Sequence, residues 1–281
     1  MMKTAAYTIC KDEITRVDRW IEYTKIFDYK VVLDCGSTDG TYEKLKKVPG
    51  IILEQYSVAP EDWRFDIPRN INLDMVPKDT NWALSPDIDE FFSINVLTQM
   101  EKTIKENPDV TNISCTRLDI YSETVFVGPP KLIGTNKIHR RHEYNWKMPI
   151  YEFLQYIGPK TEVEIFNDEI YLVHDQETNK PRSTFYPDMM RKEYKNDPTN
   201  SWNTWFLANH YYREKDLENF VQVGMDFINH SPKNEKKKRE AILGSLKTIS
   251  EAKNVDITIR KKLRNWLFLL TTPPAEAGRF W

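Results

Sequence analysis

The segment "NWALSPDIDEFF", residues 81–92, joins a short apolar run to three carboxylates within four positions. Its apolar part, over residues 80–85, has the length and composition of a buried β-strand. Like charges this close together repel one another unless a cation or strong hydrogen-bond donors offset them. The segment therefore predicts a strand that ends at a charged site, and the compensating groups have to come from elsewhere.

Predicted strands and helices alternate around this segment. The predicted strands of the first part lie over residues 5–10, 29–34, 50–56 and 80–85. The clearest predicted helices between and after them lie over residues 14–27, 66–77 and 94–107. This alternation predicts βαβ units and a mainly parallel sheet. Further strands are predicted over 110–122, 137–141 and 162–174, and the chain reads as helical from about residue 183.

The predicted fold class is therefore α/β, with a mixed, mainly parallel sheet over residues 1–185 and an α-helical appendage over residues 186–281. The chain of 281 residues is 40% hydrophobic and 29% charged, which is ordinary for a globular protein. We found no apolar run that approaches the roughly 18 residues of a membrane span. The N-terminus predicts a first strand, not a signal peptide. The three cysteines lack metal-type spacing, which indicates reduced thiols and a cytoplasmic location.

Basic residues concentrate near the C-terminus. Residues 231–264 contain eleven Lys and Arg against four Asp and Glu, although the net charge of the chain is −2. Such a segment predicts either a solvated helix face or a surface that meets phosphates or an anionic membrane.

Acidic residues follow two of the predicted parallel strands. Asp34 closes the strand over 29–34, and Asp87 with Asp89 follows the strand over 80–85. Ligands of open parallel sheets bind at the carboxyl ends of the strands, and clustered carboxylates suit Mg²⁺ or Mn²⁺ and the phosphates these ions bind. The alternatives are turn chemistry for Asp34 and an ordinary surface loop for the acidic string. The sequence contains neither a G-x-G-x-x-G nor a P-loop motif.

Three stretches in order, "VVLDCGSTDGT" (31–41), "FDIPRN" (65–70) and "NWALSPDIDEFF" (81–92), resemble the motifs of family 2 glycosyltransferases, which have the GT-A fold. The opening "ICKDE" (9–13) is also similar to that family. The tail over residues 205–220 resembles a tetratricopeptide-type helix pair. The resemblance implies a nucleotide-sugar transferase with a D-x-D motif.

A second set of matches extends the resemblance. "KIHRRHEYNWKMPIYEFL" (137–154) is similar to a family segment whose Glu corresponds to Glu152, although the preceding His of the family is Tyr151 here. "IYLVHD" (170–175) resembles a strand that ends in a metal-binding His, here His174. "KPRSTFY" (180–186) resembles a stretch that faces the donor phosphates.

The resemblance implies a role for each matching residue. The residues implied to bind the nucleotide-sugar donor are Glu13, Asp34, Arg69, Asp87, Lys180 and Arg182. Asp89 and His174 would ligate a divalent metal ion, Mn²⁺ or Mg²⁺. Glu152 would be the general base, and one base opposite one leaving group implies inversion. The simpler alternatives are a structural histidine at position 174 and a solvated carboxylate at position 152.

We therefore expect a metal-dependent inverting glycosyltransferase that uses a nucleotide-diphosphate sugar, with uridine diphosphate the family's commonest carrier. The acceptor is unidentified: a glycan, a protein or a modified nucleobase, the last left open by the basic segment. A nucleotidyltransferase would need a Gly-rich loop with a basic residue after the first strand, which "TICKDEITR" (8–16) lacks. The other alternative is a non-catalytic nucleotide-binding module whose helical tail binds a partner.

Overall fold

The computed structural model describes residues 2–121, 126–127, 131–176 and 185–271. The chain divides into two compact units, Met1–Pro181 and Arg182–Trp281. Each unit is described below by itself, and the predicted domain boundary at residue 185 stays a prediction.

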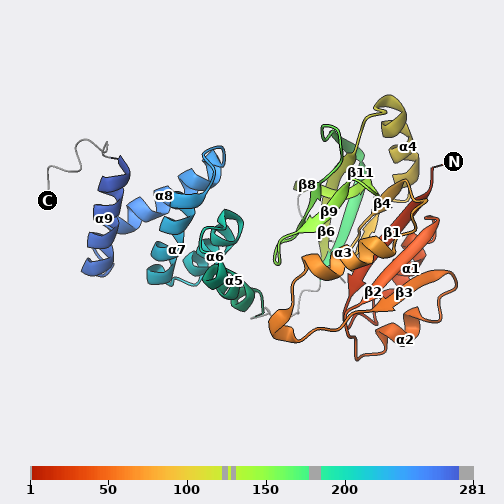
Figure 1. Ribbon diagram of the computed structural model, residues 1–281, viewed down its shortest axis with the longest axis horizontal. Helices are drawn as coiled ribbons and strands as arrows, with labels where there is room; N and C mark the ends of the chain where they lie inside the picture. Colours follow the sequence, from red (N-terminus) through yellow and green to blue (C-terminus); the bar gives the residue numbers. More distant parts are fainter. Residues whose placement is uncertain (1, 122–125, 128–130, 177–184, 272–281) are drawn as a thin grey trace. The chain divides into compact units, whose positions relative to one another are not determined.

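The first unit contains a mixed sheet, whose strands are drawn as arrows in Figure 1. Nine strands of the described residues belong to it. Four parallel neighbours form one side: β3 (Ile51–Gln55), β2 (Tyr29–Asp34), β1 (Thr4–Cys10) and β4 (Trp82–Leu84). The sheet continues through β8 (Lys131–Arg140), β6 (Asn112–Tyr121), β11 (Glu164–Gln176) and β5 (Glu90–Phe92), while β7 (Phe126–Val127) pairs with β6. In this second half β6 and β11 are parallel, and β8 and β5 run antiparallel to their neighbours. The predicted α/β class is confirmed.

Both faces of the sheet are covered. Helices α1 (Val17–Thr24), α2 (Thr41–Leu45) and α4 (Val96–Glu106) share one hydrophobic core with the sheet. Helix α3 (Asp66–Met75) and the hairpin of β9 (Tyr144–Lys147) and β10 (Phe153–Tyr156) form the other core. Along β1, Ala6 faces the first core, whereas Ala5 and Tyr7 face the second, because successive side chains of a strand point to opposite faces.

Two short elements near the acidic segment were not predicted. Strand β5 lies inside "SPDIDEFF" and pairs antiparallel with β11. The β9–β10 hairpin lies in the segment before and after Glu152. Unlike β4, these short strands do not stand in an apolar run of their own, so their partners in the fold decide that they form. A 3-10 turn, η1 (Pro60–Asp62), precedes α3.

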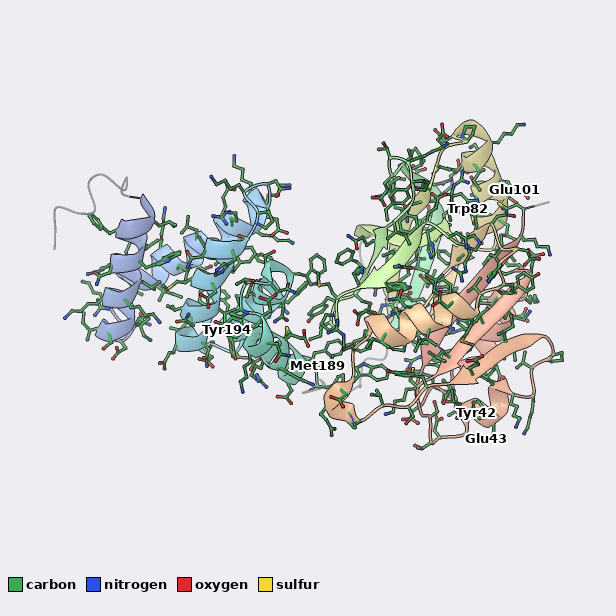
Figure 2. All side chains as sticks on the ribbon, in the orientation of Figure 1. Tyr42, Glu43, Trp82, Glu101, Met189 and Tyr194 are labelled. Atoms are coloured by element: carbon green, nitrogen blue, oxygen red, sulfur yellow. The ribbon has the colours of Figure 1, made fainter. Side chains whose placement is uncertain are left out.

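The second unit is helical, as predicted. Its described helices are α5 (Phe185–Asn196), α6 (Ser201–Arg213), α7 (Leu217–His230), α8 (Lys236–Glu251) and α9 (Ile257–Thr271). Helices α6 and α7 are separated by a short turn that contains Lys215, whose φ is +61°. Tyr194 of α5, labelled in Figure 2, donates a hydrogen bond to Asp226 of α7. Among the described helices, we find none with the length and apolarity that a membrane crossing requires.

Candidate active site

The acidic segment lies at the carboxyl edge of the parallel strands. Strands β2 and β4 are both parallel to β1, so the residues that follow them emerge on the same edge. Asp87 and Asp89 lie in the loop between β4 and β5. Lys137 of β8 is beside this loop, and its carbonyl accepts a hydrogen bond of 2.9 Å from the amide of Ser85.

Two cations compensate Asp87. Its Oδ1 accepts from Nη2 of Arg69 at 2.8 Å, and its Oδ2 accepts from Nζ of Lys137 at 2.8 Å. Burial acts to raise the pKa of Asp87, but Arg69 and Lys137 outweigh it and hold that pKa below its usual range. Asp87 is therefore an ionised carboxylate with its charge offset by neighbouring side chains.

Asp89 faces His174 of β11. Oδ2 of Asp89 lies 3.3 Å from Nε2 of His174, and Nδ1 of His174 lies 3.1 Å from Oδ1 of Asp119 on β6. Burial opposes both charges, yet the pairing lowers the pKa of Asp89 and raises the pKa of His174. The two predicted metal-binding residues thus come together from separate parts of the chain.

Glu152 lies just before β10 and is 12% exposed. Its Oε1 accepts a hydrogen bond of 2.6 Å from Nε of Arg69. The preceding Tyr151 adopts a φ of +52° and is 41% exposed, so it points outward while Glu152 turns toward Arg69. Arg69 therefore joins the predicted base to the acidic segment.

The pairs form one continuous chain of alternating charges, hereafter called the charge chain. Its members, in order of contact, are Glu152, Arg69, Asp87, Lys137, Glu90, Arg117, Asp119, His174 and Asp89. Arg117 of β6 lies 2.9 Å from Asp119 and 3.6 Å from Glu90. The charge chain thus crosses strands β8, β6, β11 and β5.

Four members of the charge chain were missed from the sequence: Glu90, Arg117, Asp119 and Lys137. A signal existed for two of them, because Arg117 and Asp119 are two residues apart in a predicted strand and so share one face. Glu90 was one of the three crowded acids of the segment, but no role was predicted for it. Lys137 offered no signal, since only the pairing of β8 with β4 brings it here.

Asp34 and Glu13 lie at the neighbouring strand ends. Asp34 is fully buried, and its Oδ1 accepts from the amides of Gly36 and Ser37 at 3.1 Å each, which is the turn chemistry considered as the alternative. Glu13 pairs with Arg16 at 2.6 Å, and Arg16 contributes to the lowered pKa of Asp89. Their nucleotide-binding roles stay predictions.

Other predicted residues can be placed more briefly. Lys180 and Arg182 lie outside the described residues. Tyr144 and Trp146, which lie in the predicted segment before Glu152, are 1% and 4% exposed and belong to the core.

The chemistry of the Asp89 and His174 pair fits a divalent cation. Within the described part of the chain, no group of three or more His, Cys, Asp or Glu forms a metal site. Mg²⁺ in phosphate-transfer sites, however, takes only one or two protein ligands and completes its shell with phosphate and water oxygens. Nδ1 of His174 contacts Asp119 and also Nη2 of Arg117. Metal-ligating histidines ordinarily have a carboxylate partner on the ring nitrogen that does not bind the metal.

Comparison with known proteins identifies the fold. No protein-family model matches the chain, and no curated protein matches it in sequence. Among solved structures, it is similar to S. aureus TarS residues 1–349 in complex with UDP-GlcNAc, with a TM-score of 0.52 and 15% identity over 94% of this chain and 92% of that one. A second crystal structure of S. aureus TarS 1–349 gives a TM-score of 0.48 with the same identity and coverage.

The likeness to the UDP-GlcNAc complex establishes that this chain has a GT-A-like fold followed by C-terminal helices. The fold expected from the sequence motifs is thereby confirmed. The tetratricopeptide-type character of the helical unit stays a prediction.

Proposed function

We propose that this protein is a metal-dependent inverting glycosyltransferase. It moves a sugar from a nucleotide-diphosphate donor to a hydroxyl group of an unidentified acceptor. A UDP-sugar is the first candidate for the donor. Support for the nucleotide-sugar donor comes from the GT-A-like fold and from the similar TarS structure, which contains UDP-GlcNAc.

The charge chain is the observation that carries this proposal. It joins Glu152 at one end to Asp89 and His174 at the other. A sugar transferase needs a base for the acceptor hydroxyl and a cationic site for the leaving diphosphate, within the reach of one donor molecule. A cluster of ion pairs that served only stability would not need Glu152 at one end. Nor would it need, at the other end, a His–carboxylate pair of the kind that binds metal ions, here His174 and Asp89.

In the proposed reaction, Glu152 takes the proton of the acceptor hydroxyl while that oxygen attacks the anomeric carbon. The bond from this carbon to the diphosphate oxygen breaks, and the nucleoside diphosphate leaves with the electron pair. A cation bound by Asp89 and His174 would neutralise charge on the leaving group. Arg69 orients Glu152, and Lys137 keeps Asp87 ionised beside the donor. Attack from the side opposite the leaving group inverts the configuration.

The decisive experiment measures nucleotide release from a panel of nucleotide sugars with Mn²⁺, Mg²⁺ or chelator. We expect one donor to be turned over with metal only, and Asp89→Ala to reduce that turnover by about 100-fold or more, because the leaving group loses its counter-charge. Asp109→Ala is the matched control, since the Asp109 carboxylate is 82% exposed and belongs to no part of the charge chain.

Equal turnover in Asp89→Ala and wild type would contradict the metal assignment. Metal-independent turnover would do the same. If the wild type binds nucleotide but releases none from any donor with a panel of glycan, protein and DNA acceptors, the chain is instead the non-catalytic binding module.

A further inference from the structure

Trp146 of β9 lies under the guanidinium of Arg69. Cζ of Arg69 is 4.6 Å from the centroid of the indole ring, and Trp146 is 4% exposed. We propose that Trp146 is a positioning residue for the base of the transfer reaction: it holds Arg69, and Arg69 holds Glu152. This inference rests on the proposed function and adds to it a residue that touches no substrate.

Arg69 is held on three sides. Its Nε donates to Glu152, its Nη2 donates to Asp87, and one face of the guanidinium rests on Trp146. The residue is 8% exposed, so water contributes little to its environment. A guanidinium binds carboxylates through its edge and aromatic rings through its face, so the three contacts are compatible only in one orientation.

Trp146 is itself fixed by hydrogen bonds. Asn70, the neighbour of Arg69 on α3, donates from Nδ2 to the Trp146 carbonyl at 2.9 Å and accepts from the Trp146 amide at 2.8 Å. The indole Nε1 donates to the hydroxyl of Tyr7 at 3.0 Å, and this hydroxyl is 2.9 Å from Nε2 of His139. Buried polar groups that are paired in this way leave the ring a single orientation.

The ring therefore determines where Arg69 and Glu152 can lie. Without it, the guanidinium can drop toward the core and withdraw from Glu152. The carboxylate would then lose both its fixed direction and its neighbouring positive charge. This loss of direction slows the reaction. A tryptophan that only packs would change stability and leave the orientation of Arg69 in place.

Trp82 of β4, labelled in Figure 2, is the matched control. It is 3% exposed, and Cζ of Arg140 lies 5.5 Å from its ring. Arg140, however, donates to the backbone carbonyls of Val110 and Pro108 at 2.7 and 2.8 Å. Trp82→Leu thus removes a buried ring beneath an arginine and leaves Glu152 untouched.

The test compares Trp146→Leu, Trp146→Met and Trp82→Leu with wild type by donor turnover. A second readout is the solvent exchange of the Arg69 Nε–H proton in NMR, assigned by its absence in Arg69→Lys. We expect Trp146→Leu to turn over donor about 10- to 100-fold more slowly, with faster Nε–H exchange. Trp82→Leu should match wild type in turnover and in Nε–H exchange.

A Trp146→Leu protein that matches Trp82→Leu in Nε–H exchange overturns the inference. If Trp146→Leu does not fold, Trp146→Met decides, because methionine fills space but offers Arg69 no ring: an exchange rate identical to wild type overturns the inference, and faster exchange supports it. If the wild type turns over no donor, the proposed function fails, while the exchange rates still decide whether Trp146 holds Arg69.

Discussion

At the scale of single residues, the crowding of Asp87, Asp89 and Glu90 is explained by the side chains that reach them. Lys137 contacts both Asp87 and Glu90, and His174 contacts Asp89. The close spacing of the three acids is therefore offset by side chains of the protein itself. Under the proposed function, such an arrangement would let the site bind and release a metal–diphosphate complex in each turnover.

Glu152→Gln tests the base at this scale. Glutamine keeps an oxygen that can accept from Nε of Arg69, but it cannot take a proton from an acceptor. We expect transfer to fall by about 10²- to 10⁴-fold, with little change in UDP affinity. The measurement is transfer rate beside UDP titration, with the exposed Glu164→Gln as control. Transfer within twofold of wild type would exclude Glu152 as the base.

At the scale of elements, buried hydrogen bonds fasten the β9–β10 hairpin to the sheet. A row of hydrogen bonds runs from Trp146 of β9 through Tyr7 of β1 to His139 of β8. It ends where Nδ1 of His139 lies 3.0 Å from the carbonyl oxygen of Arg140. His139 is fully buried, and burial lowers its pKa to about 4. The neutral imidazole donates through Nδ1 and accepts through Nε2, so this row of hydrogen bonds requires the uncharged form of His139.

This element predicts a pH dependence of stability. The unfolded chain binds a proton at position 139 near pH 6.5, whereas the folded chain does so only near pH 4. The stabilisation that comes from neutral His139 is fully present above pH 6.5. As the pH drops from 6.5 to about 4, the free energy of unfolding falls by about 1.4 kcal/mol per pH unit. Urea unfolding between pH 7.5 and 4.5 should show a shallower decline in His139→Phe.

The control for this measurement is His142→Phe, which removes an exposed ring three positions along the chain. It should keep the decline of the wild type. Identical slopes for His139→Phe and wild type would show that His139 does not carry the effect.

At the scale of the whole molecule, each unit has a core of its own. Met100 of α4 is fully buried among residues of the sheet, and Leu246 of α8 is fully buried in the helical unit. Every described member of the charge chain belongs to the first unit. The basic segment belongs to the second, where Lys236, Lys237, Lys261 and Lys262 are exposed, as either predicted role of that segment requires.

Two cores predict two thermal transitions in calorimetry. Met100→Ala should lower the temperature of one transition and Leu246→Ala that of the other. Each substitution should cost its own unit about 2–5 kcal/mol of unfolding free energy, as truncation of a buried side chain does. UDP with Mn²⁺ at about 100 times its Kd should raise only the transition that Met100→Ala lowers, by about 2.7 kcal/mol of stability. One transition that both substitutions move would mean a single cooperative unit.

The sequence by itself determined the fold class, because its signals are local. Periodicity and turn residues predict the apolar strands β1, β2 and β4 and the helices between them. They also place the acids at the ends of β2 and β4. The family resemblance also implied that Asp34, Asp89, Glu152 and His174 serve one site. Strand β5 and the β9–β10 hairpin escaped prediction because, unlike β4, they stand in no apolar run and form only against their partners.

Only the tertiary structure decided which charges meet. Lys137, Arg117 and Asp119 lie on strands that are distant from the acidic segment in the chain, and the sheet order brings them to it. Arg69 reaches Glu152 across 83 positions of sequence, and its contact with Trp146 depends on how α3 packs on β9. Local sequence sets which elements form, whereas pairs of side chains depend on contacts between elements that no short stretch of sequence encodes.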